Sequence, residues 1–307
     1  MKVENSRYHI PVLLHQAINA LNVKLGGVYA DVTFGGGGYS REILSGIGKE
    51  GKLIVFDKDE EALKNPPHDE QVLKVHADYK YLKNYLKFYG IMEIDGLVAD
   101  LGVSSYQFDS KERGFMFRED DVELDMRMDK QSVLTAKRVL NEYDVEQLAQ
   151  VFRVYGEIKN AKSLARKLVK HREDRVIETS SDLKEALGVK MHSLKKQKQF
   201  YAKVFQALRI EVNQELESLK EMLLQAAEVL KPGGRMVVVS YHSLEDRLVK
   251  YFFKTGNFKG EEVKDFYGRT VRPLKPVNTK VITPDQEEIE KNPRARSAKL
   301  RIAEKLS

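Results

Sequence analysis

Four consecutive glycines, at positions 35–38, stand between a short apolar run and a segment with helical periodicity. The run 28–32 has the alternation of a strand, and residues 39–45 are patterned like the start of a helix. Glycine has no Cβ, so such a turn lets a ligand pack against bare backbone at the amino end of a helix. This order of strand, glycine turn and helix predicts the first unit of an α/β sheet that binds a nucleotide-like ligand.

An acidic residue follows at the spacing expected for such a ligand. Asp57 lies 20 residues beyond Gly37, directly after a second apolar run. At the end of a second parallel strand, a carboxylate accepts hydrogen bonds from ribose hydroxyls. The two features together indicate an adenosine-containing cofactor. The alternative is a tight glycine turn that binds no ligand.

The first hundred residues repeat the order strand, helix, strand. Predicted strands lie at 28–32, 52–56, 71–76 and 94–99, with helical segments at 39–45, 59–64 and 79–89 between them. Strands that alternate with helices form a parallel sheet covered on both faces, because each crossover returns the chain to the same edge. The sequence therefore predicts an α/β fold with a doubly wound, mostly parallel sheet.

The alternation stops after Gln107, and helical periodicity replaces it. Helices are predicted at 132–141, 144–155, 159–172 and 181–187, with Ser132, Asp144 and Ser181 as N-caps. The sheet pattern then resumes with a helix at 205–230 that KPGG at 231–234 ends, a strand at 235–240, a helix at 245–253, loop-like residues 256–293 and a last strand at 297–305. We expect a sheet domain in two parts, 1–110 and 211–307, around an all-helical insertion at 111–210.

Positive charge is concentrated in the helical segment. The whole chain has 52 Lys and Arg against 46 Asp and Glu, and residues 131–210 hold 17 and 9 of these. The net charge of this segment is +8, whereas the whole chain carries +6. Such an excess indicates a surface that binds nucleic acid through its phosphates. The alternative is an ordinary solvated helical face.

Cysteine and histidine usage limits the chemistry. Without cysteine, the chain has no thiolate to hold an iron–sulfur cluster or to attack a pyrimidine ring. The seven histidines are scattered and none forms a pair such as HExxH, so we expect no metal site. The sequence shows no leader pattern and no run of 18 apolar residues. We therefore expect a cytoplasmic protein without membrane contact.

The predicted strands leave two cofactors open. A GxGxxG frame that starts at Gly35 ends on Ser40, and one that starts at Gly36 ends on Arg41, which argues against a dinucleotide. KPGG between a late helix and a late strand is typical of methyltransferases that use S-adenosylmethionine. The same phrase is also an ordinary helix stop.

Six phrases make the sequence resemble one family closely. They are DLGVSS (100–105), ERGF (112–115), LDMRM (124–128), FQALRI (205–210), SYHSLEDR (240–247) and NPRARSAKLR (292–301). They resemble the bacterial methyltransferases that modify the exocyclic 4-amino nitrogen of a decoding-site cytosine in small-subunit ribosomal RNA, known as the RsmH or MraW family. The resemblance runs from HIPVLL (9–14) almost to the C-terminus.

This resemblance implies a class I, Rossmann-like methyltransferase domain interrupted by a helical RNA-recognition domain. It also implies S-adenosylmethionine as cofactor and 16S ribosomal RNA, or the small ribosomal subunit, as partner. By position in the family motifs, the cofactor contacts are Gly37, Gly38, Tyr39, Asp57, Tyr79, Asp100 and Gln107. In this assignment the two glycines admit the methionine part, Asp57 holds the ribose and Tyr79 flanks the adenine. Asp100 and Gln107 border the sulfonium, and the oligomeric state stays open, with a homodimer as one option.

Three departures from the family pattern affect the expected site. Tyr39 stands where the family usually has histidine, which weakens its assignment unless its backbone makes the contact. Tyr106 stands where the family has proline and adds an aromatic ring near the expected base pocket. Residues 202–204 read Ala-Lys-Val in place of an Ala-Thr-Arg-Thr-like run, so Lys203 is left to replace a basic substrate contact in part.

Methylation of an exocyclic amine needs a group that accepts a proton while the nitrogen is held in line. We expect Asp100 in this role, with Ser104 or Ser105 assisting. The alternatives are that Asp100 serves only the cofactor and that the serines cap the following turn. His242 is a second candidate proton acceptor, and its alternative is a buried structural histidine. No covalent nucleophile is needed, in agreement with the absence of cysteine.

Further residues have both a functional and a structural interpretation. Asp125 and Arg127 either line the substrate cleft or pair with each other. The candidate platforms for a splayed base, which are otherwise core residues, are Tyr106, Phe108 and Phe115. The candidate phosphate contacts are Arg294, Arg296, Lys299 and Arg301, of which the first two, in a predicted loop, are preferred.

Three other functions remain open at the level of sequence. They are a methyltransferase of DNA or of another RNA, a noncatalytic ribosome-assembly factor with the same fold, and a nicotinamide-dependent oxidoreductase. Methyl incorporation into different nucleic acids tests the first, and S-adenosylmethionine binding tests the second. The third gives no reason for the basic helical segment.

Overall fold

The computed structural model describes residues 11–64, 69–104, 107–108, 110–116, 121–189 and 193–307. The chain divides into two compact units. The sheet unit comprises residues 1–102 and 216–307, and the helical unit comprises residues 103–215. The sequence placed the corresponding boundaries after residues 110 and 210. In both cases the helical part is one continuous segment inserted into the sheet part.

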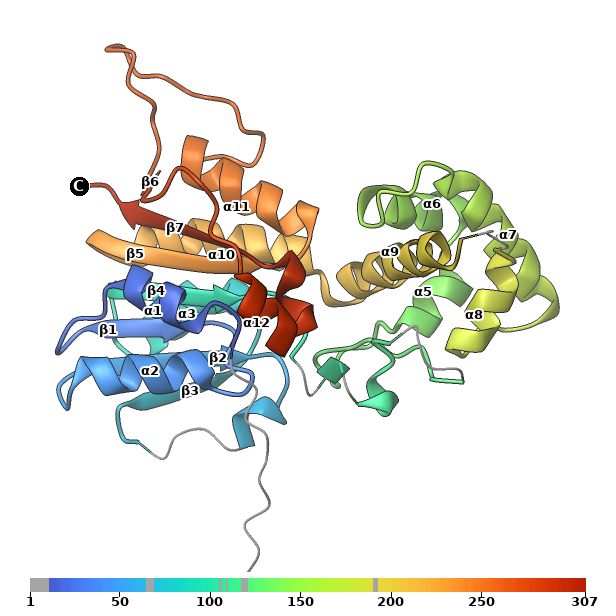
Figure 1. The fold of residues 1–307 in the computed structure, drawn as a ribbon, viewed down its shortest axis with the longest axis horizontal. Helices are drawn as coiled ribbons and strands as arrows, with labels where there is room; N and C mark the ends of the chain where they lie inside the picture. The colour runs from blue at the N-terminus through green and yellow to red at the C-terminus, as the bar shows by residue number, and fades with distance from the viewer. Residues whose placement is uncertain (1–10, 65–68, 105–106, 109, 117–120, 190–192) are drawn as a thin grey trace, which may run out of the picture. The chain divides into compact units, whose positions relative to one another are not determined.

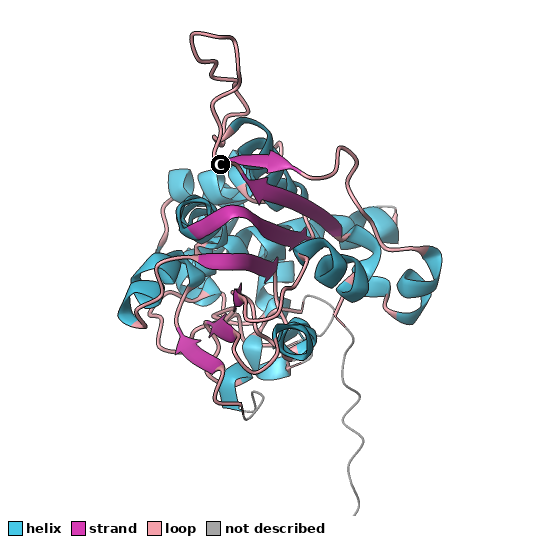
Figure 2. Cartoon of the chain, turned by 90° about the vertical axis from the view of Figure 1, so that its left-hand side faces the viewer, coloured by secondary structure: helices cyan, strands magenta, loops and turns pink. Residues whose placement is uncertain are grey.

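A seven-stranded sheet forms the centre of the sheet unit within the described residues (Figure 1). The strands are β1 Val28–Asp31, β2 Lys52–Asp57, β3 Val72–His76, β4 Ile94–Asp100, β5 Leu230–Ser240, β6 Leu274–Pro276 and β7 Lys299–Lys305. Their order is β3-β2-β1-β4-β5-β7-β6, and β7 alone runs antiparallel to the neighbours on both its sides, as Figure 2 shows from the side. The predicted mostly parallel sheet and its last strand are confirmed.

Helices cover both faces of this sheet. On one face lie α1 Leu14–Leu21 and α2 Gly38–Ile47, and on the other lie α3 Leu82–Phe88, α10 Glu215–Val229 and α11 Ser243–Thr255. Successive residues of β2 alternate between the two cores: Leu53 packs under the first pair of helices, and Ile54 packs under the second group. Strands apolar on both sides are typical of a buried parallel sheet, so the doubly wound architecture is confirmed.

The strand ends position the side chains of interest. Asp31, Asp57 and Asp100 are the last residues of β1, β2 and β4. These three strands are neighbours and parallel, with β1 in the middle, so the aspartates share the carboxyl edge of the sheet. From β1 the chain first builds β2 and β3 on one side and then β4 on the other. Ligands of open α/β sheets bind at such a reversal point.

The helical unit contains the basic segment. Its helices are α5 Ala136–Glu142, α6 Val145–Val154, α7 Ala161–Asp174, α8 Ser180–Leu187 and α9 Leu194–Asn213, and they enclose a core of their own. The predicted N-cap Asp144 is confirmed as part of a capping box with Gln147. The predicted caps Ser132 and Ser181 are wrong. Thr135 and Thr179 cap α5 and α8, because each Oγ accepts a hydrogen bond from the third residue of its helix.

Five other element predictions are corrected by the structure. The predicted helix 205–230 is divided between α9 and α10, because Gln214 adopts the left-handed conformation with φ 51°. KPGG does not separate helix from strand, since β5 already begins at Leu230 and is irregular beside Ile94 and Gly96. The loop-like region 256–293 contains β6 and α12 Gln286–Lys291. The predicted helix 59–64 is reduced to the short 3-10 turn η1 Ala62–Lys64, and 79–89 becomes η2 Tyr79–Tyr81 followed by α3.

Candidate active site

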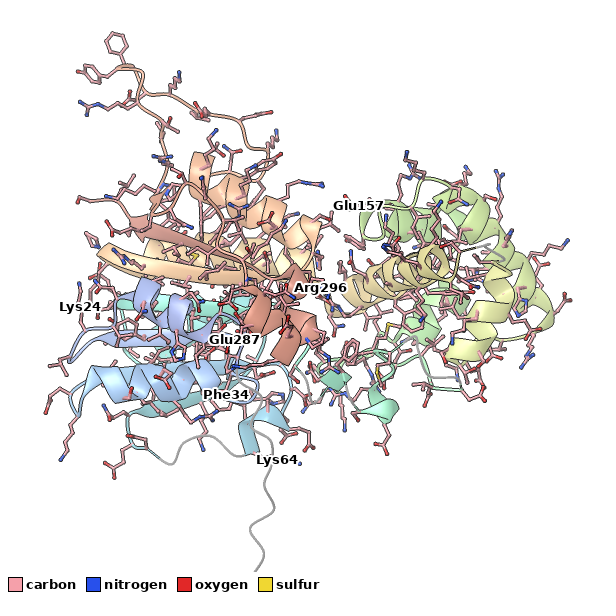
Figure 3. The ribbon with its side chains drawn as sticks, in the orientation of Figure 1. Lys24, Phe34, Lys64, Glu157, Glu287 and Arg296 are labelled. Atoms are coloured by element: carbon pink, nitrogen blue, oxygen red, sulfur yellow. The ribbon has the colours of Figure 1, made fainter. Side chains whose placement is uncertain are left out.

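The glycine turn is required in large part by the fold itself. Gly35 and Gly37 have φ of 51° and 70°, a conformation that residues with a side chain rarely adopt. A Cβ on Gly38 would lie 2.0 Å from the Pro11 ring, and one on Gly37 would lie 2.8 Å from the ring of Phe34, which Figure 3 labels. Three of the four positions thus need glycine without any ligand.

Gly36 is the exception in this turn. A Cβ built on it meets no atom within 4 Å, and its φ lies outside the left-handed region. Its carbonyl accepts a hydrogen bond from Arg41 Nη1 at 2.9 Å, which ties the turn to α2. Phe34 and Pro11 occupy the space that a side chain at Gly37 or Gly38 would need. A contact of these two glycines with a methionine moiety therefore needs a physical reason other than the missing side chains.

The amino end of α2 offers this reason. Among the described residues, no acceptor is found for the backbone N–H groups of Gly38 and Tyr39, the first two residues of the helix. Such groups, together with the helix dipole, bind anions. The Tyr39 side chain is buried, and its hydroxyl donates to the Val12 carbonyl. A cofactor contact of Tyr39 is therefore limited to its backbone.

Asp57 lies beside the glycine turn, as the sequence predicts. Its Oδ2 accepts from the Gly35 N–H at 2.8 Å, and its Oδ1 accepts from the Asp59 N–H at 2.8 Å. Burial raises the pKa of the Asp57 carboxyl to about 6, although both hydrogen bonds act in the opposite direction. Each carboxylate oxygen has a second lone pair, so the group can still accept from two ribose hydroxyls.

Asp100 is held from two sides at the end of β4. Its backbone N–H donates to Thr33 Oγ1 at 2.6 Å, and its Oδ1 accepts from the Tyr241 hydroxyl at 2.8 Å. Among the described residues, its Oδ2 has no hydrogen-bond partner and no cation pairs with it. Burial is the main cause that raises the pKa of Asp100 to about 7, and the nearby carboxylates of Asp31 and Glu245 act in the same direction.

Asp31 was missed by sequence reasoning. It is fully buried at the end of β1 and accepts from Ser40 Oγ at 2.6 Å and from the Thr33 N–H at 3.2 Å. Burial raises its pKa to about 6. The carboxylate thus ties the β1 end to the first turn of α2, and the signal available in the sequence was an aspartate ending a strand just before the glycines.

The ring of Tyr79 lies beyond β3 in a network of its own. Lys58 Nζ lies 5.9 Å from the centre of this ring and 2.8 Å from Asp78 Oδ2. Asp78 also accepts from Ser218 Oγ at 2.6 Å and caps the turn that carries Tyr79. Tyr79 is partly exposed and also packs against the core of the sheet unit. Lys58, which follows Asp57 directly, was not expected here.

The remaining predicted residues of this region lie in the helical unit. The Ser104 N–H donates to Gln107 Oε1 at 3.0 Å, and the Gln107 N–H donates to Ser104 Oγ at 3.1 Å. This reciprocal pair supports the alternative in which the serine caps the following turn. Ser105 and Tyr106 lie outside the described residues.

His242 serves as the N-cap of α11. Its Nδ1 accepts from the Glu245 N–H at 3.4 Å, while the Glu245 carboxylate accepts from the N–H groups of Tyr241 and His242. Nδ1 is thus engaged by a backbone donor of the same helix, and Nε2 lies 3.3 Å from Glu245 Oε1, so both ring nitrogens face Glu245. This arrangement favours the structural alternative for His242.

Several other functional interpretations give way to structural ones. Asp125 and Arg127 form a two-pronged ion pair with distances of 2.7 and 2.8 Å. Phe115 is buried in the core of the helical unit, so the prediction that it is a stacking platform is wrong. Phe108 packs partly buried against the same core.

The predicted phosphate contacts of β7 are also paired internally. Arg301 Nε lies 2.7 Å and Lys299 Nζ 3.1 Å from the carboxylate of Asp246. These two cations are therefore occupied by an ion pair inside the sheet unit. Arg294 and Arg296 lie exposed on the turn η4 Pro293–Ser297, where Figure 3 labels Arg296. The preference for Arg294 and Arg296 over Lys299 and Arg301 as phosphate contacts remains a prediction.

Comparisons with known proteins show the family of this chain. The model of the MraW methylase family matches residues 6–306. The chain is 53% identical over 305 residues to the "Ribosomal RNA small subunit methyltransferase H" of Bacteroides fragilis (strain YCH46), covering 99% of this chain and 100% of that relative. A protein of the same name from Parabacteroides distasonis is 53% identical over 307 residues, the full length of both chains.

Among solved structures, an rRNA methylase from Streptococcus thermophilus is similar to this chain with a TM-score of 0.45 and 12% identity. The alignment covers 97% of this chain and 99% of the other. A likeness of this degree carries no conclusion about this chain. The family match over nearly the whole length and the relatives at 53% identity are decisive. The chain therefore belongs to the MraW methylase family and is an S-adenosylmethionine-dependent methyltransferase.

Proposed function

We propose that this chain transfers the methyl group of S-adenosylmethionine to the exocyclic 4-amino nitrogen of a cytidine in small-subunit (16S) ribosomal RNA, near the decoding centre. One observation carries the chemistry. Asp100 is partly exposed, one of its carboxylate oxygens has no partner in the described residues, and its backbone N–H donates to Thr33, two residues before the glycine turn. The relatives named for the small ribosomal subunit support the choice of substrate.

The residues of the sheet unit fit the cofactor. The unpartnered N–H groups of Gly38 and Tyr39 suit the carboxylate of its methionine part. The Asp57 oxygens suit the ribose hydroxyls, and the partly exposed Tyr79 ring suits the adenine. Gly37 contributes the left-handed bend that directly precedes these N–H groups. The contact of Gln107 is supported by its place in the family motif.

Amine methylation forms a bond from nitrogen to the methyl carbon while the bond from sulfur to that carbon breaks, and one N–H proton must leave. When bound, S-adenosylmethionine supplies the methyl group on a positively charged sulfur. Asp100 accepts the proton at Oδ2, while Tyr241 holds Oδ1 in place. A pKa of about 7 suits this role, because about half of the carboxyl groups are ionised at pH 7 and the ionised form is a stronger base than an ordinary carboxylate.

The helical unit is proposed as an RNA-docking surface. Exposed cations line α7 and α9, namely Lys162, Arg166, Lys167, Lys170, Lys195, Lys196 and Lys198. Phosphate neutralisation by such side chains provides binding that is independent of sequence. Arg294 and Arg296 are proposed as further phosphate contacts. No helix among the described residues is long and apolar enough to cross a membrane. We place the reaction in the cytoplasm, and a homodimer is the assembly to test.

Mass spectrometry of nucleosides tests the proposed substrate. Purified chain and S-adenosylmethionine are incubated with small subunits that lack the mark, with protein-free 16S RNA and with DNA of matching sequence. We expect N4-methylcytidine in RNA and none in DNA. Methylation of DNA would favour the alternative of a DNA-directed enzyme. Binding of S-adenosylmethionine without methylation of any of the three would favour the assembly-factor alternative.

A further inference from the structure

A hairpin of the sheet unit exposes two aromatic side chains at its tip. The hairpin comprises residues 263–271, between α11 and β6, and its strands are joined where the Val271 N–H donates to the Val263 carbonyl at 2.7 Å. Figures 1 and 2 both show this segment extending away from the rest of its own unit. Phe266 is 98% exposed and Tyr267 is 81% exposed. Large apolar groups presented together to water mark an interaction site more often than a single exposed side chain does.

Hydrogen bonds within the hairpin fix the shape of this tip. The Asp265 N–H donates to the Arg269 carbonyl, and the Gly268 N–H donates back to the Asp265 carbonyl, at 2.9 and 3.0 Å. The Asp265 carboxylate accepts from the N–H groups of Tyr267 and Arg269, both at 2.9 Å. Gly268 has φ 79°, as the residue closing a three-residue hairpin turn requires. The acidic group therefore serves the turn, and the aromatic pair is presented in a defined geometry.

The base of the hairpin is anchored to α11. Phe258 stacks on Phe252 of that helix with ring centres 5.2 Å apart. Asn257 Oδ1 accepts from the N–H groups of three following residues, and Arg272 Nη1 donates to the Lys254 carbonyl at 2.9 Å. These contacts attach the base of the hairpin to α11. They therefore restrict the motion of the aromatic pair relative to that helix.

The chemistry of the tip selects the partner. The rings of Phe266 and Tyr267 meet edge to face, 5.6 Å apart at 88°, which leaves flat ring surface open to another planar group. Lys264 and Arg269 flank the pair and are exposed. Flat rings between cations match unpaired nucleobases, which stack on aromatic side chains while their phosphates contact Lys and Arg.

We propose that residues 264–269 form a second RNA-binding element, in which Phe266 and Tyr267 stack on unpaired bases of small-subunit ribosomal RNA and Lys264 and Arg269 contact the adjoining phosphates. The inference rests on the proposed function for the identity of the RNA. It adds a base-stacking contact from the sheet unit to the electrostatic contacts assigned to the helical unit, and it accounts for aromatic groups that the fold leaves in water.

Binding of small subunits lacking the mark tests the proposal. The full-length variant Phe266→Ala/Tyr267→Ala should bind them at least about tenfold more weakly than the wild type, since stacking contributes on the order of 5- to 150-fold per base. Phe266→Tyr/Tyr267→Phe should bind normally, because stacking needs the rings and not the hydroxyl. Phe88→Ala is the matched control: Phe88 is 78% exposed and also meets a tyrosine ring edge to face. S-adenosylhomocysteine binding and melting temperature should stay unchanged in all three variants.

The identity of the partner is tested by crosslinking Phe266→benzoylphenylalanine to bound subunits. We expect crosslinks to 16S RNA. Equal binding by the wild type and the double alanine variant would overturn the proposal, as would crosslinks confined to a ribosomal protein or to a second copy of this chain. Methylation is measured in the same samples. A wild type that binds subunits without forming N4-methylcytidine disproves the proposed function, while the binding comparison still decides the role of the hairpin.

Discussion

At the scale of single residues, the proposed site is a cluster of carboxylates at the ends of strands. Asp31, Asp57 and Asp100 end three neighbouring strands, and burial raises the pKa of each to about 6, 6 and 7. Clustering such groups costs folding free energy, because the charged forms lose water and repel one another. In the proposed site, a positively charged sulfonium would offset this cost. We therefore expect the carboxylates to favour the methyl donor over its neutral product, S-adenosylhomocysteine.

This charge preference predicts different pH profiles for the two ligands. Raising the pH from about 6 to about 8 ionises Asp100, whose pKa is about 7, so affinity for S-adenosylmethionine should rise over this range. Affinity for S-adenosylhomocysteine, which lacks the sulfonium charge, should change less. Calorimetric titrations of both ligands at several pH values provide the measurement. Parallel profiles would contradict the proposed contact, and Asp100→Asn should abolish the difference between the ligands.

A second prediction separates the two candidate proton acceptors. Asp100→Asn should lower the rate of methyl transfer by at least about 100-fold, the usual scale of general base catalysis. His242→Asn should lower it by less than about fivefold, because asparagine is a good N-cap and can replace the ring at the start of α11. Single-turnover rates with saturating cofactor give the comparison. A large loss in the histidine variant, at unchanged melting temperature, would assign the proton to His242 instead.

At the scale of elements, the parallel strands were predictable because buried strands are short apolar runs with aspartates at their ends. The break between α9 and α10 was not predictable, since glutamine seldom adopts the left-handed conformation that Gln214 has here. The N-cap Thr179 did have a signal, an aspartate three residues later, whereas Thr135 had none.

Only part of the candidate site was predictable, for a related reason. Asp57 and Asp100 follow recognisable strands, so their positions are visible in the sequence. Tyr241 and Thr33 reach Asp100 only because β5 and β1 flank β4, and this strand order is not encoded in any local pattern. The sequence predicts loop-like residues where the hairpin at 263–271 lies. The two sides of this hairpin pair through few hydrogen bonds.

The glycine turn gives a prediction at this scale. Gly38→Ala should lower the melting temperature and weaken S-adenosylhomocysteine binding, because the new methyl group would overlap the Pro11 ring. Gly36→Ala should fold like the wild type, since open space surrounds that position. Thermal unfolding followed by calorimetric titration checks both variants. A tolerant Gly38 position would mean that the contact with Pro11 is dispensable.

At the scale of the whole molecule, the proposed function assigns methyl transfer to one unit and electrostatic RNA binding to the other. The carboxylates lie in the sheet unit, and the basic excess lies in the helical unit. We predict that Lys195→Glu/Lys196→Glu/Lys198→Glu weakens RNA binding and reduces the slope of log affinity against log salt by about 2 or more. Filter binding at several salt concentrations is the measurement.

The control for this variant reverses three exposed lysines of the sheet unit, Lys49, Lys52 and Lys87. Lys52 begins β2, so it lies at the opposite end of that strand from Asp57. This control should leave the salt dependence nearly unchanged. Equal losses in both variants would mean that net charge alone drives binding, and binding insensitive to salt would refute the electrostatic role of the helical unit.

The insertion of one unit into the other also sets an order of events during protein synthesis. Residues 103–215 emerge from the translating ribosome as one continuous piece, with a core of their own, whereas β1 to β4 must wait for β5 and β7 to be made. The nascent chain can thus complete its basic helical part before β5 is made. At that stage the edge of β4 that later pairs with β5 has no partner strand. Tyr241, whose hydroxyl donates to Asp100, is made after the helical segment, so the nascent chain gains this contact only once β5 is complete.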